Sequence, residues 1–121
     1  MFILTQPQVA PQAAIPGIAL SGTLTANTSG VLDTVSSTNK TLKWIVEVFD
    51  DNTQRLMSYE ILASNFYGNE LKFSRQYVQF NTVIDHVVDV VYNGNNDIEL
   101  QITNNEANDI NFNISRIQLI Q

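Results

Sequence analysis

The stretch Thr41–Asn65, TLKWIVEVFDDNTQRLMSYEILASN, decides how the rest of the chain is interpreted. It contains two runs rich in β-branched and aromatic residues, separated by the turn-forming cluster Asp50-Asp51-Asn52. In the first run, four apolar side chains fall on one face at every second position, which is the period of a β-strand: Leu42, Trp44, Val46 and Val48. The stretch therefore predicts a β-hairpin.

The opposite face of that first run is not purely polar. It carries two large apolar side chains, Ile45 and Phe49, together with Lys43 and Glu47. A strand that is apolar on both faces is expected in the middle of a sheet or against a neighbouring subunit. We therefore name Ile45 and Phe49 as possible subunit-interface residues.

Two further hairpins are predicted, one on each side of this stretch. Toward the N-terminus, Ile18–Thr25 and Gly30–Ser36 flank a cluster of turn-forming residues. Toward the C-terminus, Asn93-Gly94 is the strongest turn signal in the chain, and we expect it to join Asn81–Tyr92 to Asp97–Asn104.

The alternation is interrupted in two strands, and each interruption predicts a β-bulge. The apolar residues between Leu71 and Phe80 share one face only if a bulge lies near Gln76–Gln79. Those of the last strand, Asp109–Ile120, do so only if a bulge lies at Ser115-Arg116. The sum is about eight short strands and no convincing helix, so we predict an all-β chain forming an antiparallel β-sandwich or jelly roll.

The amino-acid composition excludes several classes of function. The 121 residues amount to one domain, and the absence of cysteine excludes disulfides, thiolate catalysis and cysteine-ligated metals. A net charge of -6, with the acidic residues scattered along the chain, disfavours nucleic-acid binding. No stretch approaches the roughly 20 apolar residues of a membrane span. We expect neither nucleic acid nor membrane as a partner, and no cofactor.

The N-terminal region has a character of its own. Residues 1–17 contain all three prolines, which disfavour a helix and favour an extended arm, followed by a β-sandwich domain over 18–121. The arm carries apolar residues that are costly to leave in water, so we expect it to dock on its own sheet, on a sister subunit or on a larger assembly. The expected anchors are Phe2, Ile3, Leu4, Val9 and Ile15.

No residue pattern predicts catalysis. The single histidine, His86, is expected to be a structural residue near a strand end with a hydrogen-bond partner, because Asp85 and Asp89 point to the opposite face of its strand. The oxygen-rich segments Asp50-Asp51-Asn52 and Asn93–Asp97 could hold Ca²⁺, but we interpret them as ordinary turns in preference to metal sites. Three aromatic residues near loops are candidates for stacking on sugars: Phe66, Tyr67 and Tyr92.

Three phrases carry a resemblance to a known class of proteins. Lys43–Val48, Ser58–Ala63 and Asp97–Glu106 resemble, in wording, order and spacing, small virion structural proteins and tail-fibre domains of tailed bacteriophages. The resemblance covers roughly residues 41–117 and includes no catalytic residue. The first 40 residues lie outside it.

The resemblance implies a non-enzymatic β-sandwich that is made in the host cytoplasm and assembled on the phage particle. A chain with an apolar arm and no long shaft is more similar to a head-decoration or cement protein than to a complete fibre. The implied partners are further copies of itself, with a homotrimer favoured, and the major capsid protein or other virion proteins. The alternative is a tail-fibre or baseplate component that binds other tail proteins or host surface glycans.

Overall fold

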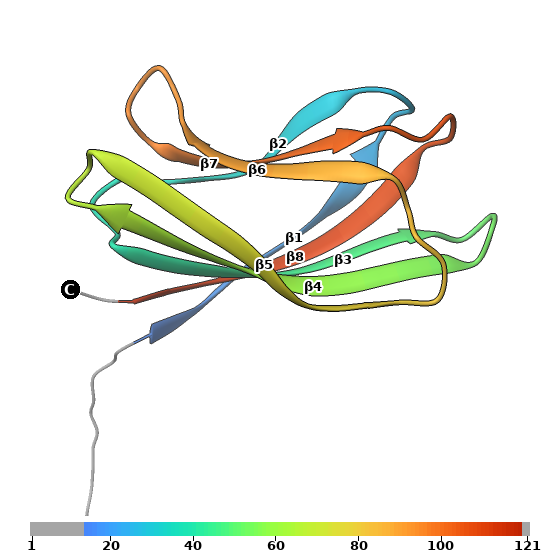
Figure 1. The fold of residues 1–121 in the computed structure, drawn as a ribbon, viewed down its shortest axis with the longest axis horizontal. Coiled ribbons are helices and arrows are strands. Elements are labelled where there is room, and N and C mark those ends of the chain that lie inside the picture. The colour runs from blue at the N-terminus through green and yellow to red at the C-terminus, as the bar shows by residue number, and fades with distance from the viewer. Residues whose placement is uncertain (1–13, 120–121) are drawn as a thin grey trace, which may run out of the picture.

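A computed structural model describes residues 14–119 as two antiparallel β-sheets packed face to face (Figure 1). This confirms the predicted β-sandwich and the expected number of strands. No helix occurs among these residues, and so none that could cross a membrane. The strands are β1 (Ala14–Leu24), β2 (Ser29–Val35), β3 (Thr41–Asp50), β4 (Arg55–Phe66), β5 (Glu70–Phe80), β6 (His86–Tyr92), β7 (Ile98–Asn104) and β8 (Ile110–Leu119).

The two sheets differ in width. The large sheet has five strands in the order β1-β8-β3-β4-β5, and the small sheet has three in the order β2-β7-β6. The predicted central hairpin is confirmed as β3 and β4, which pair without interruption from Thr41–Ser64 to Asp50–Arg55. Because β3 also pairs with β8, it is the middle strand of the large sheet.

The core lies between the sheets. The inward face of β3 is at most 1% exposed and carries the four side chains expected there: Leu42, Trp44, Val46 and Val48. From the small sheet, β7 contributes Ile98, Leu100 and Ile102, which are also buried as expected. Strict alternation of buried and partly exposed residues in both strands fixes their register, since a one-residue slip would turn the apolar set to solvent.

The predicted N-terminal hairpin is wrong. β1 pairs with β8 in the large sheet, whereas β2 pairs with β7 in the small sheet. The intervening turn is tight, with Asn27 at a φ of 56° and the Thr28 hydroxyl donating to the Thr25 carbonyl at 2.7 Å. Such a turn reverses the chain equally well between two sheets as within one, so local residues do not specify pairing.

One predicted bulge is confirmed and the other is misplaced. β5 has one extra residue between Gln76 and Gln79, with Tyr77 at a φ of 57°. β8 runs in unbroken register with β3 through Ser115 and Arg116, because Arg116 itself takes the inward position. The extra residue belongs instead to the partner strand β1, between Pro16 and Ala19.

The strand predicted over 81–92 is shorter in the structure and begins at His86. Its inward face is the expected one, with Ile84 and Val90 buried and His86 at the strand end. The hairpin from β6 to β7 is confirmed, but the positive φ in its turn falls on Asn96 and not on Gly94.

Part of the expected arm belongs to the sheet. β1 begins at Ala14, and Ala14, Ile15 and Pro16 are in register with β8. The anchors Phe2, Ile3, Leu4 and Val9 lie outside the described residues.

Candidate assembly surface

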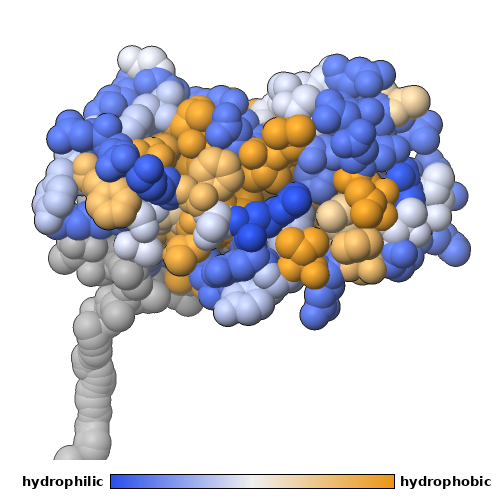
Figure 2. Space-filling model, viewed as in Figure 1, coloured by the Kyte–Doolittle hydropathy of each residue, from blue (hydrophilic) through white to orange (hydrophobic). Residues whose placement is uncertain are grey.

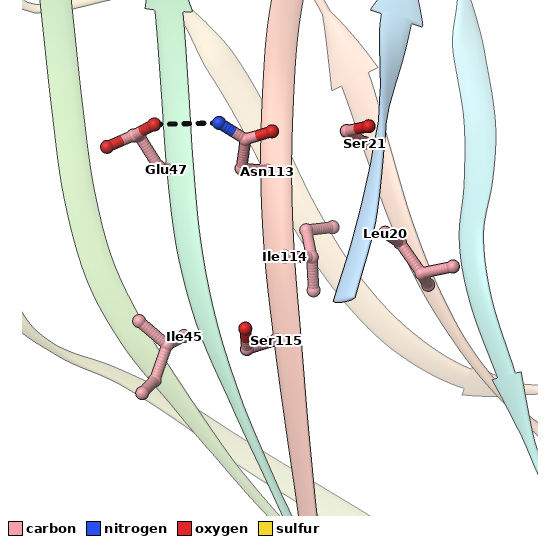
Figure 3. A pocket seen from close by; sticks show the side chains of 7 residues that line it. All are labelled: Leu20, Ser21, Ile45, Glu47, Asn113, Ile114 and Ser115. Carbon is pink, nitrogen blue, oxygen red and sulfur yellow. Dashed lines mark hydrogen bonds between the residues drawn. The ribbon is translucent and has the colours of Figure 1, made fainter. Parts of the chain in front are cut away.

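The outer face of the large sheet holds the two residues named as a possible subunit interface. Ile45 is 44% exposed, and Phe49 is partly buried on the same face. Ile45 lines a shallow pocket whose other walls are mainly polar, with the Asn113 amide donating to Glu47 at 2.9 Å (Figure 3). The Lys43–Glu60 ion pair, 3.0 Å, lies on this face too. The surface is mixed, and Ile45 shares it with two exposed apolar residues of β4, Leu56 and Leu62, which pair with Phe49 and Lys43.

A second surface with exposed apolar side chains lies where β5 meets β6. Phe73 remains 38% exposed there, although it pairs with the buried Ala63 of β4. Beside it lies a hollow, here called the β5–β6 groove, which is lined by Phe73, Arg75, His86, Val87 and Val88.

Exposed apolar side chains are frequent in the segment that contains this groove, where Phe73 and Val87 line it and Phe80 lines a separate pocket with Leu56. The described residues have twelve large hydrophobic side chains that are exposed, and six of them fall in the segment from β5 to the start of β6: Phe73, Tyr77, Val78, Phe80, Val83 and Val87. Figure 2 shows hydrophobic surface gathered across the middle of the face that β5 and β6 present. Contiguous apolar surface of this kind marks sites of protein interaction.

His86 closes one end of the groove as a structural residue. Its Nδ1 lies 2.7 Å from the Ile84 carbonyl, which can only accept, so Nδ1 carries the proton and Nε2 accepts from the Tyr59 hydroxyl at 2.7 Å. Burial lowers the pKa of His86, with the Arg75 charge acting in the same direction, and it raises the pKa of Tyr59. Both ring nitrogens are therefore occupied: the bond to Tyr59 holds β6 against β4, and the bond to Ile84 is local to the segment before β6.

A buried ion pair, which was not predicted from the sequence, connects the two sheets. Arg116 of β8 donates to both carboxylate oxygens of Asp33 of β2 at 2.8 Å, and the Trp44 indole donates to the same carboxylate at 2.8 Å. All three side chains are largely or completely removed from solvent. The available signal was the unbroken alternation of β8, which places Arg116 in phase with Ile114.

The aromatic residues proposed for sugar stacking differ in their settings. Phe66 and Tyr67 lie exposed at the turn between β4 and β5, and the Lys40 ammonium sits 5.6 Å from the centre of the Tyr67 ring. Tyr92 is partly buried and donates its hydroxyl proton to Asn65. Only Phe66 and Tyr67 therefore present open rings beside a pocket.

In the oxygen-rich turns, the side-chain oxygens of Asp50 and Asn93 accept hydrogen bonds from neighbouring residues. Asp50 accepts from the Asn52 amide at 3.0 Å and from Arg55 at 3.2 Å, while Asn93 accepts from two amides of its own turn. Among residues 14–119, no three acidic or histidine side chains converge as a metal site would require. The geometry explains both segments as turns.

These features define an all-β sandwich with a wide sheet, a narrow sheet and an apolar groove at one edge. No protein-family model and no curated protein matches the chain. Among solved structures, the chain is similar to the tailspike protein of Acinetobacter phage vB_ApiP_P1, with a TM-score of 0.46 and 10% identity. The likeness covers 99% of this chain and 24% of the tailspike, so the chain spans about a quarter of that protein. A likeness of this degree defines neither a family nor a function.

Proposed function

We propose that this chain is a non-enzymatic structural protein of a bacteriophage particle, and that it decorates the capsid as a cement protein. The resemblance of three phrases to virion proteins supports this, and these phrases fall on β3, β4 and β7. In this role the protein binds other copies of itself and the major capsid protein. Many weak contacts then act together, because each subunit is held at several points.

The observation that carries the proposal is the concentration of exposed apolar side chains along β5 and β6. At about 25 cal/mol per Å² of apolar surface, covering such side chains supplies part of the free energy of assembly. A structural role also agrees with the His86–Tyr59 pair, whose polar atoms are engaged in holding strands together.

A tail component is the alternative, and one feature favours it. Phe66 and Tyr67 expose their rings at a loop, with Tyr67 84% exposed, and open aromatic rings suit stacking on sugars. Under this alternative the chain binds host surface glycans through the turn between β4 and β5.

Location in the particle tests the proposal. We expect mass spectrometry of purified phage to detect the chain, and gold-labelled antibodies against it to decorate heads. Label confined to tails would favour the tail alternative, and a glycan array should then show binding that is lost in Tyr67→Ala. Absence of the chain from purified particles would rule out both roles.

The outer face of the large sheet gives a second expectation. If Ile45 and Phe49 lie at a subunit contact, the double variant Ile45→Ser/Phe49→Ser should reduce the oligomer to monomers, as measured by light scattering coupled to size-exclusion chromatography. Val31→Ser is a matched control, since Val31 is 51% exposed on β2 in the other sheet.

Folding of the variants is checked by circular dichroism. Because Phe49 is partly buried, the single variant Ile45→Glu separates loss of assembly from loss of stability, as Ile45 is 44% exposed. Oligomers of unchanged mass in both interface variants would show that this face is not the contact.

A further inference from the structure

We propose that the β5–β6 groove is the acceptor site for the N-terminal segment Phe2–Gln6 of a second copy of this chain, which adds a strand to the free edge of β6. This inference rests on the proposed function, because it supplies the contact by which the subunits associate. The small sheet then gains a fourth strand, which covers the groove.

The site lies where the free edges of the two sheets meet. β6 is an edge strand of the small sheet, and β5 is an edge strand of the large sheet. In the groove between them, the ring of Phe73 is 38% exposed although Phe73 pairs with the buried Ala63. A strand added to β6 would cover this ring.

The edge of β6 differs from the other three edges. β1, β2 and β5 each contain an extra residue that interrupts their pairing, and bulges of this kind prevent further strands from adding. β6 pairs with β7 without interruption from His86 to Tyr92. Within residues 14–119, β6 is therefore the one edge strand of regular register.

The free edge of β6 is protected against further strands by a local hydrogen bond, which an incoming strand can displace. The backbone amide of Val90 donates to the carboxylate of the adjacent Asp89 at 2.9 Å, which satisfies this amide without a neighbouring strand. An incoming carbonyl can replace that carboxylate, which returns to water. Asp89 also restricts which strands can bind, because its negative charge would repel a strand that carries acidic residues.

The N-terminal segment has the chemistry that this site requires. Residues 1–13 contain no charged side chain, whereas the chain as a whole has a net charge of -6. Phe2–Gln6 is free of proline, so each residue has an N–H to donate, and Pro7 ends the run. In the proposed strand, side chains alternate between two faces, so Phe2 and Leu4 would face the groove and Ile3 would face outward.

The length of the N-terminal segment favours a second copy, and not the same copy, as the donor of the added strand. The described chain begins at β1, and β1 and β5 are opposite edges of the large sheet, four strand spacings or about 19 Å apart. The path must also rise about 10 Å to the level of the small sheet. The connecting residues Pro7–Ala13 span at most about 25 Å when fully extended. That length leaves nothing over for the longer path around the outside of the sandwich.

Disulfide trapping between two differently tagged copies tests the site, and the chain has no cysteine of its own. One copy carries Ile3→Cys, and the other carries Val87→Cys or Asp89→Cys, which cover two registers of pairing on the outer side of β6. We expect co-expressed copies to form a covalent heterodimer on mild oxidation. Val31→Cys is the control acceptor, because Val31 and Val87 are 51% and 53% exposed.

The outcomes separate the inference from the proposed function. A heterodimer with a β6 cysteine but not with Val31→Cys supports the site, and equal or absent yields overturn it. A single chain with both Ile3→Cys and Val87→Cys that closes on itself at monomer mass also overturns it. A chain that is found in particles but gives no selective disulfide refutes this site alone; a selective disulfide in a chain absent from particles refutes the virion role alone.

Discussion

Replacing Asp33 with alanine is expected to lower the free energy of unfolding by about 3–5 kcal/mol, because it leaves the Arg116 guanidinium buried without its counter-charge. Asp33 accepts two hydrogen bonds from Arg116 and one from Trp44, and the three residues belong to β2, β8 and β3. The Nε of Arg116 is already buried without a partner, so nothing else near it replaces the carboxylate. Urea unfolding followed by Trp44 fluorescence measures the loss.

The double variant Asp33→Val/Arg116→Met is the matched control. It removes both charges and fills the same space with apolar groups, so we expect it to recover most of the stability lost in Asp33→Ala. An Asp33→Ala protein within 1 kcal/mol of the parent would show that the pair contributes little. A double variant no more stable than the single one would show that packing, and not charge, determines the loss.

Replacing Asn104 with alanine is expected to cost about 2–4 kcal/mol, because one buried and three partly buried hydrogen bonds to the backbone are lost together. Asn104 is fully buried at the end of β7. Its amide donates to the carbonyls of Leu24, Thr25 and Asn108 at 2.9–3.1 Å, and its oxygen accepts from the Glu106 amide at 2.8 Å. One side chain thus ties the corner after β1 to the turn before β8.

Asn113→Ala provides the comparison for Asn104→Ala. Asn113 lies exposed on β8 and makes one side-chain hydrogen bond, to Glu47, so its loss should change stability by less than about 0.5 kcal/mol. Thermal and urea unfolding of both variants gives the difference. Equal losses would contradict the role assigned to Asn104.

The expected interface residues show how far sequence reasoning reaches. Apolar side chains on both faces of β3 singled out Ile45 and Phe49, and the structure does place them on the outer face of the sheet. The same reasoning assigned the apolar residues of β5 to a common face, and the bulge at Tyr77 was found where expected. It could not show that Phe73 stays exposed, because exposure there depends on how the edge of the other sheet packs beside β5.

The buried Asp33–Arg116 pair illustrates a second limit. Ile117 and Leu119 are out of phase with Ile114, which suggested a bulge at Ser115-Arg116. The structure instead keeps the register and turns Arg116 inward, which is normally unfavourable for an arginine. The carboxylate that makes it favourable comes from a strand 83 residues away in the sequence. Long-range compensation of this kind cannot be read from the local pattern.

The sequence by itself determined the strands, the central hairpin and the face of each core strand, because alternation and turn chemistry act over a few residues. Only the tertiary structure decided which strands pair across the sandwich, since the tight turn after β1 joins two sheets and not two neighbours. It also decided where exposed apolar side chains gather. The groove forms where the edge strand β5 meets the regular edge of β6, and that arrangement arises from packing and not from any single segment.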